Sequence, residues 1–444
     1  MDEKTTQDSL REAFEEEDYG RVDELLVELH PSEIADLLES LPVKSRELLW
    51  GLIQPELQGD VLSHAQDAVR TSLLELMHPK QVADATIGLD TDDAADILQD
   101  LPEDVIESVL RSMDAQNRDR VSSILSYPED TAGGLMNIDV VSVRADVSID
   151  VVARYLRQLG ELPEQTDSLM VVDRQNLYVG MLPLSLILTT RPEATVGETM
   201  EKGVAIPANT NDHDVAKTFE QRDMFSAAVV DDEGRLLGRI TVDDVVDVIQ
   251  EEAGQAVYSM AGLGDDDMFA PVLFSAKRRA VWLGINLVTA FLASWVIGRF
   301  ENTIQQLVAL AVLMPIVASM GGIAGSQTLT IAIRGLALGQ LSKSNSRFLM
   351  LKECAVGLLN GMVWACVVAV VAILWFKDVP LGLIIGLAMI INLLIAAIAG
   401  AVIPLTLKKF GVDPAIAGGV LLTTVTDVIG FMTFLGLATI FLLP

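Results

Sequence analysis

The chain has 444 residues, of which 50% are hydrophobic, and its formal net charge at pH 7 is −31. Residues 1–276 contain 57 of the 62 Asp and Glu residues, whereas residues 277–444 contain only 5, so an acidic half precedes an apolar half. This division excludes a single soluble globule, and the excess of carboxylates argues against nucleic-acid binding, which requires clustered Lys and Arg. Two cysteines, both in apolar sequence, exclude a disulfide scaffold and a thiolate metal cluster.

Residues 1–130 are predicted to form an all-α domain, because amphipathic segments alternate there with Pro and Gly. The region is self-similar, since residues 32–42 (SEIADLLESLP) match residues 92–102 (DDAADILQDLP) at an offset of 60. Short helices repeated in this way predict a small superhelical domain. The first residues lack the apolar core of a signal peptide, so we expect this domain to stay in the cytoplasm.

Residues 131–248 contain a second internal repeat. Residues 169–173 (LMVVD) match residues 227–231 (AAVVD) at an offset of 58, and each copy is predicted to run strand, helix, two strands, helix. This order resembles a tandem pair of CBS domains. The second copy ends in GRITVDD, similar to the GxxTxxD segment with which CBS modules hold adenosine nucleotides. Thr241 and Asp244 are therefore candidates for binding ATP, and the sequence leaves open whether that site is occupied.

A run of carboxylates follows the second copy, in a segment expected to be helical. Its members are Asp243, Asp244, Asp247, Glu251 and Glu252, followed by Asp265, Asp266 and Asp267. Like charges four residues apart destabilise a helix by roughly 0.2–0.5 kcal/mol per pair. Carboxylates without nearby Cys or His suit hard cations such as Mg²⁺ or Ca²⁺. We expect divalent cations to neutralise this run, the alternative being a merely solvated acidic surface.

Five apolar segments follow, near residues 280–298, 305–333, 349–376, 379–407 and 415–443. Each meets the roughly 20 residues needed to cross a bilayer. With a cytoplasmic N-terminus, nine basic residues lie in the cytoplasmic flanks of the spans and only two in the outer flanks. This excess favours that orientation, which places the C-terminus outside. The sequence therefore predicts a multi-pass protein with lipid around its spans, and a bacterial inner membrane is the expected location.

Two of these spans carry stripes of small and hydroxyl side chains, which are unfavourable against lipid. The stripes comprise Ser319, Gly322 and Ser326 in the second span and Gly419, Thr423, Thr424 and Gly430 in the fifth. Asp427 lies about midway along the fifth span, where an ionisable group costs roughly 2.5–3.5 kcal/mol on insertion scales. A cation ligand is the favoured explanation of Asp427, and a protonated structural Asp or a salt bridge to another helix are the alternatives.

Three motifs appear in order along the chain: residues 129–136 (EDTAGGLM), 315–327 (PIVASMGGIAGSQ) and 424–430 (TVTDVIG). With the helical domain, the CBS pair and five spans, the chain resembles the MgtE family of magnesium transporters and channels. The resemblance implies a homodimer whose pore is lined by the second and fifth spans of 277–444, with Asp427 as the pore aspartate. Residues 249–276 would form a connecting helix that plugs the pore. Regulatory Mg²⁺ would bind at Asp92, Asp96, Asp223, Asp244, Asp247 and Glu252.

The function expected from the sequence is passive conduction of Mg²⁺ into the cytoplasm, limited by cytoplasmic Mg²⁺, and not an enzymatic reaction. The chain has no GxxxxGK[ST] loop, which argues against an ATP-driven pump. Alternatives are a channel for other divalent cations such as Co²⁺ or Mn²⁺, an anion channel, a proton-coupled exchanger, and a Mg²⁺ or nucleotide sensor without flux. Ile323 and Gly419 replace Asn residues often found in the family, and Gln255 and Ala256 replace acidic ones, so selectivity and gating are expected to differ.

Overall fold

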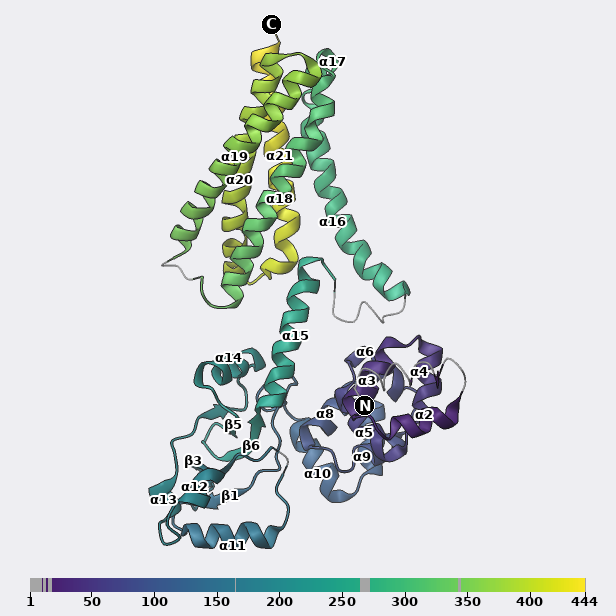
Figure 1. Cartoon of the computed structure of the whole chain (residues 1–444), viewed down its shortest axis with the longest axis vertical. Helices are drawn as coiled ribbons and strands as arrows, with labels where there is room; N and C mark the ends of the chain where they lie inside the picture. The colour runs from purple at the N-terminus through teal and green to yellow at the C-terminus, as the bar shows by residue number, and fades with distance from the viewer. Residues whose placement is uncertain are drawn as a thin grey trace. The chain divides into compact units, whose positions relative to one another are not determined.

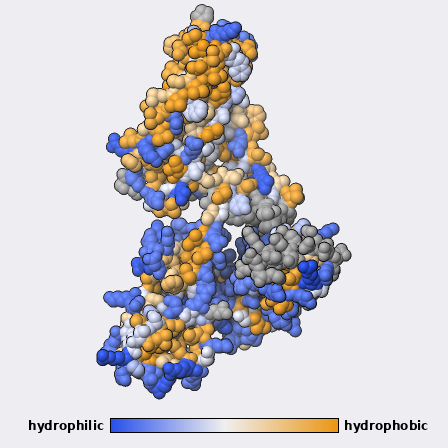
Figure 2. Space-filling model, in the orientation of Figure 1, coloured by the Kyte–Doolittle hydropathy of each residue, from blue (hydrophilic) through white to orange (hydrophobic). Residues whose placement is uncertain are grey.

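The computed structural model describes residues 10, 13, 14, 18–163, 165–263, 272–341 and 345–443. The chain divides into two units, Met1–Ala253 and Gly254–Pro444, called here the N-terminal and C-terminal units (Figure 1). Hydrophilic side chains dominate the visible surface of the first, and hydrophobic ones cover the long helices of the second (Figure 2). Each unit is described by itself.

The N-terminal unit begins with short helices stacked as a superhelix. They are α2 (Tyr19–Leu26), α3 (Pro31–Ser40), α4 (Val43–Trp50), α5 (Pro55–His64), α6 (Asp67–Leu74), α7 (Pro79–Ala85), α8 (Thr91–Gln99), α9 (Glu103–Ser112) and α10 (Ala115–Ile124). Pro31, Pro55 and Pro79 each occupy the first helical turn, where the missing N–H costs nothing. Because alternate helices pack together, α3 on α5, α5 on α7 and α7 on α9, the superhelix predicted from the repeat is present.

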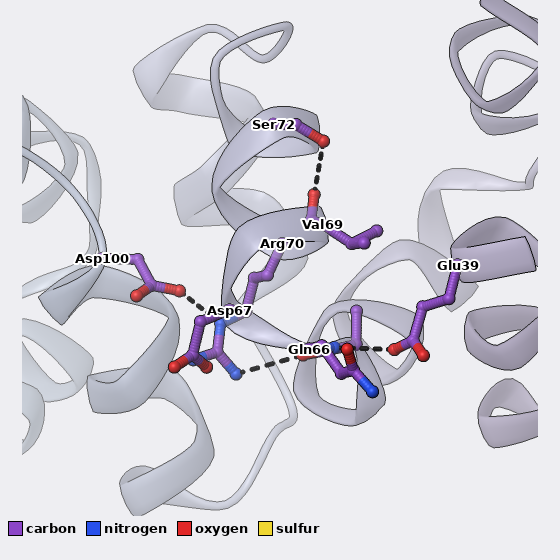
Figure 3. Close-up of polar contacts among 8 residues, drawn as sticks. Glu39, Gln66, Asp67, Val69, Arg70, Ser72 and Asp100 are labelled. Carbon is purple, nitrogen blue, oxygen red and sulfur yellow. Dashed lines mark hydrogen bonds and ion pairs between the residues drawn. The ribbon is translucent and has the colours of Figure 1, made fainter. Parts of the chain in front are cut away.

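A buried guanidinium links helix α6 to the end of α8. Arg70 of α6 places Nε 2.5 Å from Oδ2 of Asp100 and Nη2 2.7 Å from Oδ1 of Asp67 (Figure 3). The neighbouring Gln66 N–H donates to Glu39 Oε1 of α3 at 2.8 Å. Since the Arg70 side chain is only 9% exposed, its charge depends on these carboxylates for compensation.

The two repeat copies form two sheets of the same topology. The first contains β1 (Ser142–Arg144), α11 (Ile149–Leu159), β2 (Ser168–Val172), β3 (Tyr178–Pro183) and α12 (Leu184–Thr189). The second contains α13 (Val196–Thr199), β4 (Ala205–Pro207), α14 (Asp212–Arg222), β5 (Ser226–Val230), β6 (Leu236–Thr241) and α15 (Val242–Met260). In both, the central strand pairs parallel with the first and antiparallel with the third. Met170 and Val172 pack against Ala228 and Leu236, which joins the two copies through one apolar cluster.

The helix expected over residues 249–276 has different bounds. Helix α15 ends at Met260, and Gly262 follows in the left-handed region at φ +68°, a conformation that stops a helix. Residues 272–276 belong to the first span instead. Residues 264–271, which include Asp265, Asp266 and Asp267, lie outside the described residues.

The C-terminal unit contains five helices long and apolar enough to cross a membrane. They are α16 (Val272–Gly298), α18 (Ala309–Ala337), α19 (Ser346–Phe376), α20 (Val379–Lys409) and α21 (Pro414–Leu442), with the short α17 (Glu301–Gln306) between the first two. Helix α20 packs against α18, α19 and α21 and is the centre of the bundle. The predicted architecture of an all-α domain, an α/β CBS pair and a five-helix bundle is thus confirmed.

Candidate cation sites

Helix α18 has two opposite faces. Val317, Gly321 and Gly325 are buried on the inner face, whereas Ser319 and Ser326 are exposed on the other. Along this second face, where α18 lies beside α21 (Figure 1), a cavity of about 1000 Å³ opens. Its lining consists of Ala318, Ser319, Gly322, Ile323, Ser326, Gln327, Thr330, Ile331, Thr423 and Asp427.

The cavity brings together part of the site expected from the sequence. Ser319, Gly322 and Ser326 line it from α18, and Thr423 lines it with Asp427 from α21. Their spacing of three and four residues in each helix explains why they share a face. The structure thus presents hydroxyl groups and one carboxylate along a single groove.

The other three predicted lining residues lie outside this cavity. Gly419 is partly exposed with open space around its Cα, and the Thr424 hydroxyl donates to its own helix at Val420 O, 2.7 Å away. Gly430 is buried against α20, because a Cβ there would meet the Asn392 amide nitrogen at 2.9 Å. The small-residue pattern does not distinguish a glycine facing a groove from one facing a packed helix.

Asp427 is half-buried and belongs to no ion pair within the described part of the chain. The salt bridge considered from the sequence is therefore not formed there. A carboxylate in an apolar span without a compensating cation destabilises the fold, so such groups are typically functional. Its polar neighbours along the cavity are hydroxyl and amide side chains, which can hydrogen-bond to the water shell of a cation, and Ala318, Ile323 and Ile331 form the apolar part of the lining.

Two residues of interest escaped the sequence reasoning. Gln327 lines the cavity beside Ser326; it ends the 315–327 motif, but the sequence reasoning did not count it among the lining residues. Glu353 is a second carboxylate within a span, only 5% exposed, and it accepts a hydrogen bond from Thr328 at 3.0 Å. Lys352 Nζ lies 3.6 Å from its other oxygen, so Glu353 has a cation beside it, and it does not line the cavity.

In the N-terminal unit, helix α8 meets the start of α15 through carboxylates. Asp92 is 7% exposed, and its Oδ1 has no hydrogen-bond partner among the described residues. Burial, and then the charge of Asp244, raise the pKa of Asp92 well above its ordinary value. Burial, Asp90 and Asp243 likewise raise the pKa of Asp93 to about 6. The ionised forms of these carboxyl groups therefore oppose the contact of the two helices.

Among the carboxyl groups of α15 that face α8, Asp244 has the most strongly raised pKa. Burial and then the neighbouring Asp243 raise its pKa to about 8, although the Thr241 N–H and hydroxyl both donate to Oδ2, at 3.2 and 3.0 Å. Burial and Asp243 also raise the pKa of Asp247, which His64 opposes. Asp92, Asp244 and Asp247 thus contribute to one acidic interface, called here the α8–α15 cluster together with Asp93 and Asp243.

The remaining predicted regulatory residues lie elsewhere. Burial raises the pKa of Asp96 to about 7 against the opposing charge of Arg70, and Glu129 adds to the rise. Glu252 Oε1 accepts a hydrogen bond from His213 Nδ1 of α14, 2.5 Å away. Asp223 is exposed at the end of α14, in the left-handed conformation at φ 50°.

The α8–α15 cluster fits a hydrated divalent cation. Across the residues that the structure describes, no three His, Cys, Asp or Glu side chains converge tightly enough to hold a metal by themselves. Mg²⁺ does not need three, because it keeps several waters and is usually held by one or two carboxylates. The unpartnered Asp92 oxygen beside Asp244 supplies such a pair.

The five-helix bundle, its groove with hydroxyl side chains and an unpaired carboxylate, and the acidic CBS-containing unit are features of a multi-pass membrane transport protein. Comparison of the sequence with known protein families supports this class. A divalent cation transporter family model matches residues 314–437, an MgtE intracellular N domain model matches 29–130, and a CBS domain model matches 195–251.

The magnesium transporter MgtE of Thermus thermophilus is 31% identical over 444 residues, or 98% of each chain. That of Bacillus subtilis is 29% identical over 417 residues, or 94% of this chain and 92% of that one. A solved cytosolic domain of the Mg²⁺ channel MgtE in complex with ATP is 32% identical, with a TM-score of 0.50, over 55% of this chain and 99% of that one. The chain belongs to the MgtE family of magnesium transporters, as its motifs predicted.

Proposed function

We propose that this protein conducts Mg²⁺ across the membrane along the groove between α18 and α21, with Asp427 as the ion ligand. The observation that carries the proposal is the unpaired Asp427 carboxylate in a groove that also presents hydroxyl side chains from α18 and α21. Mg²⁺ sheds its water reluctantly, so a wide groove with few charges suits it better than a closed cage. Ser319, Ser326 and Thr423 would hydrogen-bond to the hydrated ion.

The conducting form is proposed to be a homodimer. In one copy the polar face of α18 is exposed, and polar side chains facing lipid are unfavourable. A second copy related by a two-fold axis would cover this face and add its own carboxylate, because such an interface presents the same patch from both subunits. Two Asp427 side chains would then supply the pair that Mg²⁺ usually requires.

The proposed direction is inward and passive. Basic residues in the flanks of the spans favour a cytoplasmic N-terminus in the inner membrane. An inside-negative potential contributes about 2.3 kcal/mol per charge per 100 mV, and so twice that for a divalent cation. No further energy source is needed for entry.

Cytoplasmic Mg²⁺ is proposed to regulate this flux through the α8–α15 cluster. Mg²⁺ bound at Asp92, Asp244 and Asp247 would compensate negative charges that burial, and secondly the neighbouring carboxylates, make unfavourable. An ion held from both helices would thereby stabilise the contact of α8 with α15. Asp96, Asp223 and Glu252 are proposed as further regulatory ligands. Thr241 and Asp244 are proposed to hold ATP, which the solved cytosolic domain of a relative contains.

The test is Mg²⁺ flux into liposomes that contain the purified protein at low lumenal Mg²⁺. The wild type is compared with Asp427→Ala and with Asp378→Asn, a control that removes a carboxylate at the N-cap of α20 and keeps the cap. We expect flux in the wild type and the control and none in Asp427→Ala.

Two other outcomes would select a different function. A folded wild type that binds Mg²⁺ but passes no cation would support a sensor without flux. Larger flux with Co²⁺ or Mn²⁺ than with Mg²⁺ would support another divalent substrate, with Ile323 and Gly419 as the first positions to examine. Flux that persists in Asp427→Ala would remove Asp427 from the pathway.

A further inference from the structure

Asn392 is a buried amide at the centre of the bundle that the proposed pathway does not use. Between Val379 and Leu405 it is the only polar side chain of α20, and it is completely buried. Its Nδ2 donates to the carbonyl of Val317 in α18 at 2.8 Å. A polar group is thus placed where every neighbour along its helix is apolar.

The amide fills the space between α18 and α21. A Cβ on Gly321 of α18 would lie 2.3 Å from Asn392 Nδ2, and a Cβ on Gly430 of α21 would lie 2.9 Å from the same atom. Both contacts are shorter than Cβ atoms normally make, so a side chain at either glycine would displace the Asn392 amide, which takes the room that two side chains would occupy. Asn392 therefore acts as a spacer between the two helices that line the cavity.

Packing alone does not explain an amide at this position. The Asn392 Oδ1 is buried without a hydrogen-bond partner among the described residues. A buried acceptor without a donor destabilises a fold, whereas a leucine of similar size would carry no such penalty. The planar amide, anchored by its one bond to Val317, holds α18 at a defined distance and rotation, which a leucine cannot do.

Both glycines touching the amide adjoin the ion pathway. Gly321 precedes Gly322, which lines the cavity, and Gly430 follows Asp427 by three residues, about 4.5 Å along the helix axis. We propose that Asn392 is a positioning residue of the pathway, which sets the separation of α18 and α21 and thereby the selectivity of the site at Asp427. This inference rests on the proposed function, in which the ion passes Asp427.

The experiment uses the full-length protein in liposomes and measures Mg²⁺ flux, Ca²⁺ flux and melting temperature. The variants are Asn392→Ala, Gly321→Ala, their double variant, and Gly436→Ala as a control, because a Cβ at Gly436 of α21 meets open space. Gly321→Ala should lower the melting temperature and the flux of both ions. The double variant should recover both, since the new methyl group enters the space that the amide vacates.

The decisive readout is the ratio of Mg²⁺ to Ca²⁺ flux. Groups that orient an ion ligand typically change metal affinity or activity by about 10–100-fold when they are replaced. We expect Asn392→Ala to shift the ratio by about tenfold or more and Gly436→Ala to leave it unchanged. A wild-type ratio in Asn392→Ala, or losses that are equal for both ions and follow the melting temperature, would overturn the inference.

Failure of the proposed function has a different signature. A wild type without flux, or an Asp427→Ala variant that conducts, would remove the pathway and this inference with it. The remaining case is a wild type that conducts, an Asp427→Ala variant that passes no ion, and an Asn392→Ala variant with the wild-type ratio of Mg²⁺ to Ca²⁺ flux. In that case only the role of Asn392 is overturned.

Discussion

Aspartate residues have three distinct roles in this chain, and the surroundings of each residue decide which role it has. Asp378 and Asp413 accept backbone N–H bonds at the starts of α20 and α21, a role that stabilises a helix end. Asp244 is buried among other carboxylates, so its charge is unfavourable unless a cation or a proton neutralises it. Asp427 faces a groove in the spans with no charge nearby, where a mobile cation is the natural partner.

The raised pKa of Asp244 predicts that the N-terminal unit loses stability as pH rises in Mg²⁺-free buffer. Below the ordinary pKa of 3.8 the carboxyl is neutral in both the folded and unfolded states. Between pH 3.8 and about 8 the folded form keeps a proton that the unfolded chain releases, so the free energy of unfolding falls as pH rises through this range. Above about pH 8 the folded form carries the full cost of an ionised, buried Asp244. Melting curves of residues 1–253 from pH 5 to pH 9 measure the trend.

Asp244→Asn should flatten this pH dependence. Each unit of pKa shift corresponds to about 1.4 kcal/mol, so at pH 8 the amide should stabilise the unit by at least that much, or roughly 3 °C. Saturating Mg²⁺ should stabilise the wild type and have less effect on the variant. A steeper loss of stability in Asp244→Asn than in the wild type would contradict the proposed cause.

Among elements, the contact of α6 with α8 depends on the buried Arg70. Replacing it by methionine keeps much of the side-chain volume but leaves Asp100 without its cation, and breaking such a pair costs about 3–5 kcal/mol. Chemical unfolding of residues 1–253 should show this loss. Arg111→Met is the control, because its pair with Glu107 is 76% and 68% exposed and should contribute less than about 1 kcal/mol. Equal effects would show that burial does not matter here.

The close approach of α18 and α20 makes a second prediction. A Cβ at Gly400 of α20 would lie 2.7 Å from the Gly325 carbonyl oxygen of α18, so Gly400→Ala must push the helices apart. Overfilling of a packed core typically costs about 1–3 kcal/mol, and we expect a lower melting temperature in detergent together with reduced Mg²⁺ flux. Gly284→Ala in α16 meets open space and should behave as the wild type. A Gly400→Ala variant with normal stability would show that these helices are loosely packed.

For the whole molecule, the proposed regulation predicts how flux responds to internal Mg²⁺. The triple variant Asp244→Asn, Asp247→Asn, Glu252→Gln removes carboxylates proposed to hold Mg²⁺, so the ion can no longer join α15 to α8. Wild-type flux should fall as Mg²⁺ rises on the side of the N-terminal unit, and the variant should conduct more at high Mg²⁺, by about 5–150-fold if the coupling is of ordinary size. Proteoliposome flux at several internal concentrations measures this. Unchanged inhibition would exclude these residues from gating.

Much of the architecture could be predicted from the sequence because it depends on patterns of apolar and polar residues that lie close together along the chain. Helical and strand periodicity, the repeats and the long apolar runs predicted the superhelix, the CBS pair and the five spans, and these are confirmed. Bounds were less well predicted. The connecting helix ends at Met260 rather than near residue 276, because the backbone of Gly262 adopts a left-handed conformation that no pattern of apolar residues records.

The sequence by itself determined the membrane character of this protein, its acidic N-terminal unit, its family and the position of Asp427, since charge and hydropathy are properties of the chain. Only the tertiary structure decided which small residues line the cavity and which pack inside. Ser319 faces the groove, whereas Gly430 accommodates the Asn392 amide. It also decided that Asp92 lies against Asp244, 152 residues further along the chain. Such partners come from different elements, and a periodic pattern within one element cannot specify what packs against it.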